Sequence, residues 1–434
     1  MARGSEERKI PGNKLTRKGG KVFYGWVITA ASIVVLAAGI GMYSSTNGLF
    51  VIPVCETLGI SRGQYSVHRT LITIVSAFAM PFYGKLIRRL GVRNMLLIGS
   101  AALGIVTGCY SMAQSIWHLY LLAALNGIFV NAISFMVIGM LISEWFVGRR
   151  GFATGLAFSG SGLGGALSIP AVNRVIELYG WRAAYVFIGA LGLIILVPVI
   201  LALIKNNPQM AGLSPYELTD REKSRIRSAG APERDLPLGA ALKTGRFWLL
   251  AVAFFLISCL CNVTIAHSAP FLQDTGYTAA AASAAVSFYM ASLSAGKILL
   301  GFVYDRFGVM SGNAVIAACC LVFPVAALLA HIPALPWIYA MTAGIASSGF
   351  SVPVPILIIK YFGARDYPMI FSAMTMVTTA GSAVSVPAMG AVYDYAGSYQ
   401  PAWFALLAFS VIIAISMFLA ELKNRAPAKH DVAA

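Results

Sequence analysis

Twelve apolar segments of about 20 residues follow one another along this chain, and such a pattern is compatible with few folds. They lie at approximately 23–52, 62–86, 94–113, 116–143, 150–176, 181–204, 246–270, 279–303, 312–332, 336–361, 367–391 and 400–421. A helix of about 20 residues spans the hydrocarbon core of a bilayer, where unpaired backbone groups find no partners. The sequence therefore predicts an all-α polytopic membrane protein with 12 transmembrane helices.

The composition excludes an ordinary soluble domain, because 58% of the residues are hydrophobic and 11% are charged, against about 25% charged in soluble domains. The first apolar run, from about Val22 to Val51, is too long for a cleaved signal peptide and is expected to remain as the first span. We expect no metal site and no redox centre, because the cysteines lie mostly in apolar runs without metal-ligand spacing; they are Cys55, Cys109, Cys259, Cys261, Cys319 and Cys320.

The two halves of the chain resemble each other at an offset of 217 residues. This offset carries Gly84 onto Gly301 and Ser168 onto Ser385. Because each half contains an even number of spans, the repeats are parallel and related by an axis along the membrane normal. The expected organisation is an N-terminal tail (1–22), a six-helix bundle (23–204), a central loop (205–245), a second six-helix bundle (246–421) and a C-terminal tail (422–434).

The distribution of basic residues predicts the orientation in the membrane. Of the 32 Lys and Arg residues, 27 lie on the side shared by both termini and by the central loop, so that side is expected to be cytoplasmic. The formal net charge of +16 thus reflects topology, and no nucleic-acid partner is needed to explain it. We expect a multi-pass protein of the plasma or inner membrane that contacts lipids and functions as a monomer.

Two glycine-rich basic turns, after the second and eighth spans, resemble those of the major facilitator superfamily, whose pattern is Gly-x-x-x-Asp-Arg-x-Gly. The second turn has the full pattern, and the first has Arg88 in place of the acidic residue. The resemblance implies a cytoplasmic gate at these turns and a fold of two six-helix bundles. The gate residues are Gly84, Arg89, Gly91 and Arg93 in the first turn and Gly301, Asp305, Arg306 and Gly308 in the second.

Shorter motifs resemble the monocarboxylate transporter and oxalate/formate antiporter branch of that superfamily. They are Tyr24-Gly25-Trp26, Ser61-Arg62, Tyr179-Gly180-Trp181-Arg182 and the segment from His267 to Gly276. The resemblance implies transport of small organic anions, monocarboxylates such as lactate, formate or oxalate-like acids, by alternating access. Either symport with protons or anion exchange would fit.

Lys297 lies inside the eighth span, where a charge costs about 2.5–3.5 kcal/mol and normally faces a partner or an aqueous cavity. It is our main candidate for binding a substrate carboxylate, and the alternative is an internal salt bridge. The resembled branch has a cation at this place. Its monocarboxylate carriers also have an Asp four residues earlier, where this chain has Leu293, so their proton relay does not transfer.

Three further titratable residues are candidates. Arg69 in the second span either binds the anion as an auxiliary contact or extends to the outer headgroups. His267 at the end of the seventh span either carries a coupling proton or is an interfacial histidine bound to a carbonyl. His68 is the second candidate for proton coupling.

Polar residues within apolar helices either hydrogen-bond between helices or line a central cavity, which the resemblance assigns to spans one, four, seven, eight and ten. The candidates are Tyr43, Ser45, Asn47, Asn126, Asn131, Asn262 and Tyr289, of which Tyr43 and Asn131 are preferred. Gly160 to Gly165 matches a dinucleotide-binding pattern, but it lies within a span and is interpreted as helix packing. We expect no cofactor.

The competing functions belong to different classes. No metalloprotease, nucleophile-elbow or Walker motif is present, so neither an intramembrane enzyme nor an ATP-driven pump is expected. An exporter of drugs or other metabolites on the same fold, or a non-transporting membrane sensor, remains an alternative.

Overall fold

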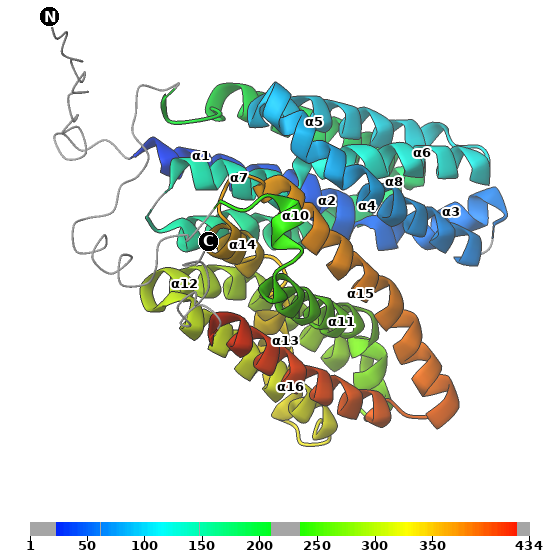
Figure 1. Ribbon diagram of the computed structural model, residues 1–434. Coiled ribbons are helices and arrows are strands. Elements are labelled where there is room, and N and C mark those ends of the chain that lie inside the picture. The colour runs from blue at the N-terminus through cyan, green and yellow to red at the C-terminus, as the bar shows by residue number, and fades with distance from the viewer. Residues whose placement is uncertain (1–22, 61, 147, 210–234, 423–434) are drawn as a thin grey trace, which may run out of the picture.

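The structure is a computed structural model that describes residues 23–60, 62–146, 148–209 and 235–422. These residues form helices joined by short turns, with no strand among them (Figure 1). The first half contains α1 (Tyr24–Leu36), η1 (Ala37–Gly41), α2 (Met42–Ser45), η2 (Asn47–Phe50), α3 (Val51–Leu58), α4 (Arg62–Leu90), α5 (Val92–Cys109), η3 (Tyr110–Met112), α6 (Ile116–Phe129), η4 (Val130–Ile133), α7 (Phe135–Trp145) and α8 (Arg150–Leu203). The second half contains α10 (Leu238–Ala241), α11 (Gly245–Asp274), α12 (Ala279–Leu328), α13 (Leu335–Ser348), α14 (Pro353–Phe362), α15 (Tyr367–Ala396) and α16 (Gln400–Leu422).

The helices account for the twelve predicted spans. Nine helical segments of the described chain are long and apolar enough to cross a membrane. Two of them, α8 and α12, each contain two spans, because Gly180 (φ 81°) and Gly308 (φ 83°) break the helix in a region of positive φ that glycine tolerates. The remaining span is α4, whose apolar stretch runs from Val67 to Met80. The predicted all-α fold of twelve transmembrane helices is confirmed.

Within the first bundle, glycines of the fifth span let α8 approach the first span closely. A β-carbon built on Gly164 would lie 2.5 Å from Cα of Ala37, and one built on Gly160 would lie 2.9 Å from Cα of Ile33. Contacts this short leave no room for a larger side chain. The Gly160–Gly165 pattern therefore serves helix packing in this fold.

Three spans are interrupted near their middle. The first span contains the π-helix η1 followed by the 3-10 turn η2, the fourth span contains the 3-10 turn η4, and the tenth is broken between Ser348 and Pro353. The offset of the internal repeat relates two of these breaks, since it carries Ser134, just after η4, onto Ser351. Irregular backbone at membrane depth occurs where it is buried in protein or lines a cavity, so these breaks point to the centre of the molecule.

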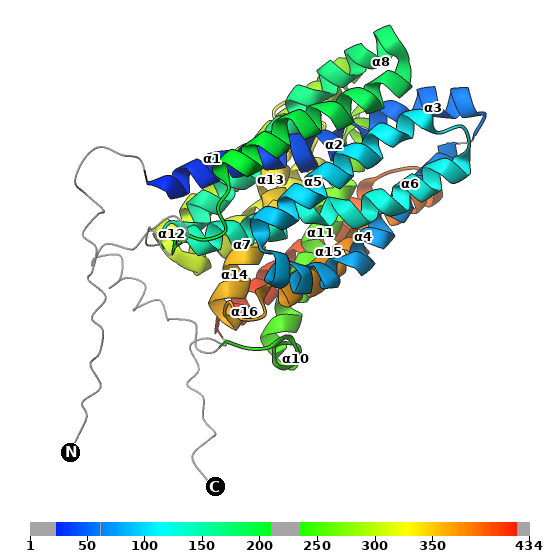
Figure 2. The ribbon, with the colours of Figure 1, turned by 90° about the horizontal axis from the view of Figure 1, so that it is seen from above.

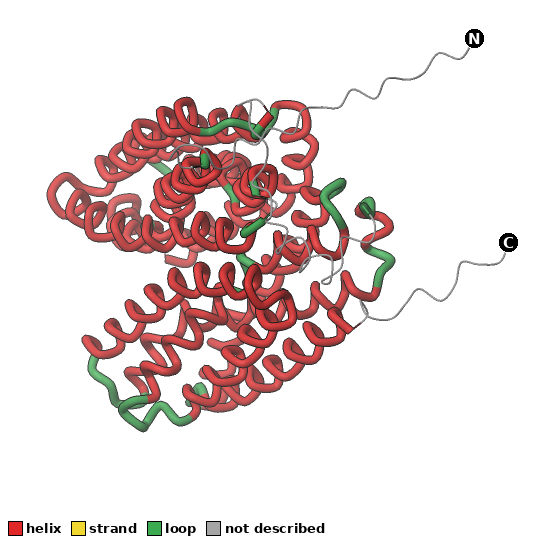
Figure 3. The backbone as a smooth tube through the Cα atoms, turned by 90° about the vertical axis from the view of Figure 1, so that its left-hand side faces the viewer, coloured by secondary structure: helices red, strands yellow, loops and turns green. Residues whose placement is uncertain are grey.

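The two bundles meet at one end and diverge at the other (Figure 3). We call the end where the described chain begins and ends, at Phe23 and Leu422, the terminal face, and the opposite end the far face. Contact between the bundles is concentrated toward the terminal face, where α8 packs on α12 and α4 packs on α15. The far ends of α3 and α15 lie well apart in Figure 1.

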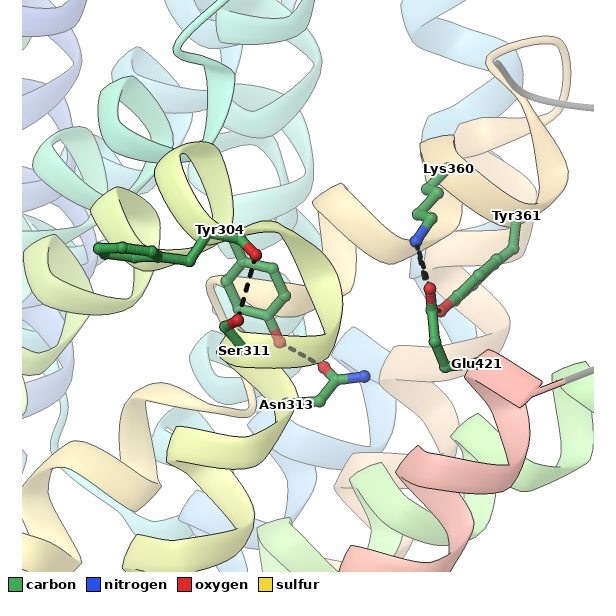
Figure 4. A network of polar contacts seen from close by, with 7 residues as sticks. Tyr304, Ser311, Asn313, Lys360, Tyr361 and Glu421 are labelled. Atoms are coloured by element: carbon green, nitrogen blue, oxygen red, sulfur yellow. Dashed lines mark hydrogen bonds and ion pairs between the residues drawn. The ribbon is translucent and has the colours of Figure 1, made fainter. Parts of the chain in front are cut away.

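Polar contacts tie the second bundle together near the terminal face (Figure 4). Lys360 Nζ of α14 lies 2.9 Å from Glu421 Oε1 of α16, and the Tyr361 hydroxyl donates to the same carboxylate. The Tyr304 hydroxyl donates to Asn313 Oδ1 at 2.6 Å and so bridges the break at Gly308. The short helix α10 lies at the periphery (Figure 2), where the N–H of the preceding Leu236 donates to the Phe362 carbonyl.

Candidate functional site

A cavity of about 280 Å³ lies between the two bundles, at the level of the helix breaks. The first span contributes Tyr43 beside η1, the fourth contributes Asn131 and Ser134 at η4, and the tenth contributes Phe350 and Ser351 at its break. Helices α4, α5, α8 and α15 complete the wall, with His68, Ser76, Ala77, Met80, Thr107, Tyr185, Ile188, Phe371, Met374, Thr375, Thr378 and Thr379 among the lining residues. The broken helices thus surround the space between the bundles.

Four residues that line the cavity each have a buried polar atom without a hydrogen-bond partner among the described residues. These atoms are the Tyr43 hydroxyl, His68 Nδ1, Thr107 Oγ1 and Ser134 Oγ, all from the first bundle. A buried polar group without a partner costs about 1–3 kcal/mol, and most such groups in folded proteins are satisfied. The atoms themselves are sealed from the cavity, so they could meet a ligand only if their side chains turned toward it.

Stacked aromatic rings form the wall of the cavity toward the far face. The rings of Phe50 and Tyr185 stack with centroids 4.0 Å apart, and those of Tyr110 and Tyr185 with centroids 4.9 Å apart. His68 Nε2 lies 2.8 Å from the Tyr110 hydroxyl, which holds the imidazole against this stack. The Tyr65 hydroxyl contacts that of Tyr185 at 3.4 Å. This wall is therefore rigid and largely apolar.

Asn131 lines the cavity and also joins two helices. Its side-chain nitrogen donates to the Ser76 carbonyl at 2.8 Å, and its oxygen accepts from Ser76 Oγ at 2.9 Å. Both ends of the amide are thereby paired with α4. This reciprocal bond fixes the irregular turn η4 at the cavity wall.

Lys297 is not among the described residues that line the cavity; it lies at the interface of α12 with α8 and is 3% exposed. Its Nζ donates to Ser161 Oγ at 2.8 Å and to the Phe158 carbonyl at 3.3 Å, both on the first bundle. Nζ lies 5.2 Å from the ring centroid of Phe135, which itself lines the cavity. Lys297 has no ion pair within the described parts of the chain, so the alternative of an internal salt bridge is not found there.

At the terminal face, Asp305 joins the two bundles. Its carboxylate oxygens accept from the backbone N–H groups of Gly151 at 2.8 Å and Phe152 at 2.7 Å, in the first turn of α8. A negative charge at this position is favourable because unpaired N–H groups and the helix dipole meet there. We call this contact the Asp305 latch.

Other residues of the two basic turns shape the terminal face. Gly91 (φ 77°) and Gly308 (φ 83°) permit the sharp turns, and a β-carbon on Gly84 would lie 2.8 Å from Cβ of Pro368 in α15. A β-carbon on Gly301 would lie 2.8 Å from the carbonyl carbon of Gly151. The remaining side chains are basic: Arg93 Nη2 donates to the Leu201 carbonyl at 2.7 Å, Arg306 lies 5.9 Å from the ring centroid of Phe307, and Arg89 is exposed.

The sequence profile of the Major Facilitator Superfamily matches residues 29–343 and 268–434. The chain belongs to the Major Facilitator Superfamily. It is 27% identical over 321 residues to the oxalate:formate antiporter of Oxalobacter formigenes, covering 72% of this chain and 71% of that protein. It is 25% identical over 395 residues to monocarboxylate transporter 13 of Rattus norvegicus, covering 89% of this chain and 86% of the relative.

A solved structure of the same superfamily has a similar fold. The crystal structure of the transporter FucP in the outward conformation superposes with a TM-score of 0.67 at 13% identity, covering 92% of this chain and 99% of FucP. The family and relatives establish a multi-pass membrane transporter, and they agree with the predicted absence of enzymatic activity at that general level.

The other sequence-predicted site residues of this superfamily member lie outside the cavity lining. Tyr289 donates to Ser347 Oγ at 2.9 Å, and Asn262 donates to the Ser258 carbonyl at 2.9 Å. His267 lies 3.2 Å from the Val386 carbonyl through Nε2 and 3.4 Å from the Tyr399 hydroxyl through Nδ1. Arg69 is exposed on α4. Their proposed roles stay predictions, whereas Tyr43, Asn47, Asn126, Asn131 and His68 do line the cavity.

Several cavity residues of this transporter were not singled out from the sequence. Ser134 and Ser351 lie beside helix breaks, and Thr375, Thr378 and Thr379 of α15 form a polar edge of the cavity. Signals were present: Gly349 followed by Pro353 predicts a weakened helix, and repeated threonines in an apolar span are unusual. Nothing in the sequence distinguished Tyr110 and Tyr185 from the other aromatic residues of the spans, so they could not be assigned to the cavity.

Proposed function

We propose that the protein is a secondary transporter of small organic anions, in particular monocarboxylates, which it moves by alternating access. The observation that carries the proposal is the cavity between the bundles, which is lined by neutral polar side chains and has the buried cation of Lys297 near its wall. The names of the relatives, an oxalate:formate antiporter and monocarboxylate transporters, support the same substrate class.

In this proposal Lys297 is the counter-charge of the substrate carboxylate. Its ammonium lies 5.2 Å from the centroid of the Phe135 ring, which lines the cavity, and a movement of that ring would open a path between the ammonium and the cavity. A carboxylate would then replace the hydroxyl of Ser161 as the principal partner, and pairing of the two charges would lower the cost of burying each. Arg69 would be an auxiliary contact during entry from the far face.

Coupling would be either proton symport or anion exchange. His68 lies at the cavity and His267 on α11, and both are candidates for carrying a proton in a symport cycle. We further propose that the terminal face is cytoplasmic, since most basic residues lie there. The transporter would act as a monomer in the plasma or inner membrane, and the Asp305 latch would close its cytoplasmic gate.

The test is uptake of labelled monocarboxylates into proteoliposomes, with and without a pH gradient, for the wild type and Lys297→Ala. The matched control is Lys243→Ala, which removes an exposed lysine outside the cavity. We expect Lys297→Ala to reduce uptake at least tenfold and Lys243→Ala to leave it unchanged. Normal uptake by Lys297→Ala would refute its role as counter-charge. Absence of carboxylate flux in the wild type would favour an exporter of other metabolites or a sensor.

A further inference from the structure

The chemistry of the cavity wall carries an inference about the substrate, which rests on the proposed transport of organic anions. No Lys, Arg, Asp or Glu belongs to the described residues that line the cavity. His68 and three tyrosines are the titratable groups of the lining. Most of the wall is aliphatic or aromatic, so a charged substrate meets few groups that replace its water.

The two bundles contribute apolar surface on opposite sides of the cavity. On the first bundle, the stacked rings of Phe50, Tyr185 and Tyr110 form a continuous aromatic wall. On the second bundle, Phe350 and Phe371 face the same space. Flat aromatic surfaces on two sides suit a ring or a branched aliphatic group, which gains stability in proportion to the apolar area it buries.

The polar part of the site is shared by the two bundles. The neutral hydrogen-bonding side chains of the lining include Asn47 and Asn126 on the first bundle and Thr375 and Thr378 on the second. They suit a keto or hydroxyl oxygen of a substrate. The nearby cation, Lys297, can compensate one carboxylate, whereas a second carboxylate would be buried without a counter-charge at a large energetic cost.

The volume of the cavity agrees with a substrate that carries a larger group beside its carboxylate. The cavity volume of about 280 Å³ is close to the lower end of the range of about 300–1,000 Å³ typical of pockets for drug-sized ligands. Formate or oxalate would touch only a fraction of the wall at one time. A larger acid would contact both aromatic surfaces at once.

We propose that the cavity selects monoanionic carboxylates with an aromatic or branched apolar body and a keto or hydroxyl oxygen, such as aryl-substituted or branched 2-oxo and 2-hydroxy acids. Unsubstituted short acids bind more weakly, and dicarboxylates such as oxalate bind weakest. The carboxylate lies toward Phe135 and Lys297, and the apolar body lies between the ring stack and Phe350.

Binding to the purified full-length protein, measured by calorimetry, tests the proposal with matched pairs of ligands. Phenylpyruvate and 4-methyl-2-oxovalerate are compared with pyruvate, phenyllactate with lactate, and oxalate and formate complete the series. The amide of phenylpyruvate is the neutral control. We expect the larger acids to bind at least tenfold more tightly than their short counterparts, and the amide to bind at least tenfold more weakly than its acid.

The possible results separate this inference from the proposed function. If oxalate, formate or pyruvate binds as tightly as the larger acids, the proposed substrate class is wrong while anion transport stands. If no carboxylate binds better than the neutral amide, the proposed transport of anions is itself wrong. Tight binding restricted to the larger acids supports both.

Variants of the wall locate the selectivity. Ala77→Phe fills part of the cavity from α4, and it should weaken phenylpyruvate binding at least tenfold while changing pyruvate binding less than threefold. The matched control is Thr73→Phe, which places the same ring at an exposed position one turn away on the same helix. Phe350→Ala, a truncation that adds no bulk, should also weaken phenylpyruvate more than pyruvate. Equal losses for both ligands in Ala77→Phe and Phe350→Ala would overturn the proposal.

Discussion

Lys297 Nζ and Ser161 Oγ lie 2.8 Å apart across the boundary between the two bundles. The lysine is on α12 and the serine on α8, so the bond joins the bundles as well as satisfying a buried charge. Near this level α8 and α12 are in close contact, since a β-carbon on Gly155 would lie 3.0 Å from the Lys297 carbonyl carbon. Separation of the bundles at the terminal face would break this bond, so we expect Lys297 to couple the cavity to the opening of that face.

Ser161→Ala should therefore make the terminal face open more often. The ammonium would keep the Phe158 carbonyl as its acceptor and lose its shorter contact. A hydrogen bond to a charged group that keeps a second acceptor contributes about 1–2 kcal/mol. Its loss should shift the equilibrium between the closed and the open terminal face about 5–30-fold.

The reporter for Ser161→Ala is maleimide labelling of Ser372→Cys in a background without the six native cysteines. Ser372 is buried at the contact between α15 and α4, where its hydroxyl lies 3.3 Å from the Met80 carbonyl. The control site, Ser410→Cys, is equally buried but lies inside the second bundle. Faster labelling at 372 and unchanged labelling at 410 is the expected result, and unchanged labelling at both sites would contradict the coupling.

Asp305→Asn should weaken the Asp305 latch without removing its side-chain volume. The amide retains one acceptor oxygen and loses the charge that favours the first turn of α8. Spin labels at the exposed positions Lys85 and Lys243, one on each bundle, should give an additional longer distance in pulsed electron resonance. Arg365→Gln, which alters an exposed basic residue outside both basic turns, serves as the control, and identical distance distributions in all three proteins would be evidence against the latch.

The helix count could be predicted from sequence, because apolar length fixes the number of spans. The second basic turn, with Gly301, Asp305 and Gly308, was also recognisable as a local pattern. The partners of Asp305 were not predicted, because Gly151 and Phe152 are distant in the sequence and meet it only through packing of the two bundles. The predicted start of the second span coincides with the start of α4 at Arg62, and its end is four residues short of Leu90, because the basic last turn remains helical.

The assignment of polar side chains to the cavity was less complete, also for a physical reason. A transmembrane helix that is apolar on all faces contains no periodicity that says which face meets the cavity. The depth of Tyr289 and Asn262 was predictable, but their direction depends on packing, and both hydrogen-bond within the second bundle. The interruptions η1 and η4 likewise depend on tertiary contacts, such as the bond between Asn131 and Ser76.

Gly164→Ala should destabilise the first bundle, because its β-carbon would lie 2.5 Å from Cα of Ala37 on the neighbouring span. Backbone atoms cannot give way as a flexible side chain does, so the spans must separate at a cost of about 1–3 kcal/mol. The matched control is Gly390→Ala in α15, where no heavy atom lies within 4 Å of the added carbon. Thermal unfolding in detergent should show a lower Tm for the first variant alone, and equal Tm values would argue against close packing at Gly164.

The internal repeat shows that the terminal face is asymmetric, because only one of the two basic turns has an acidic residue. The offset of 217 carries Arg88 onto Asp305, so the first bundle lacks the acidic acceptor. An offset of 216 carries Phe152 onto Pro368, which has no N–H to donate. A second latch between α4 and α15 therefore lacks its acceptor and also lacks one of its two donors. Gly84 packs against Pro368 at this place.

Restoring both groups with Arg88→Asp and Pro368→Ala should create a second latch and slow the opening of the terminal face. Either substitution alone supplies only half of the contact, so the effect should be non-additive, with a coupling energy of about 0.5–3 kcal/mol. Labelling of Ser372→Cys in the four proteins of the double-mutant cycle measures this coupling. We expect the double variant to be labelled more slowly than the sum of the two single effects predicts. Additive effects would mean that no contact forms between positions 88 and 368.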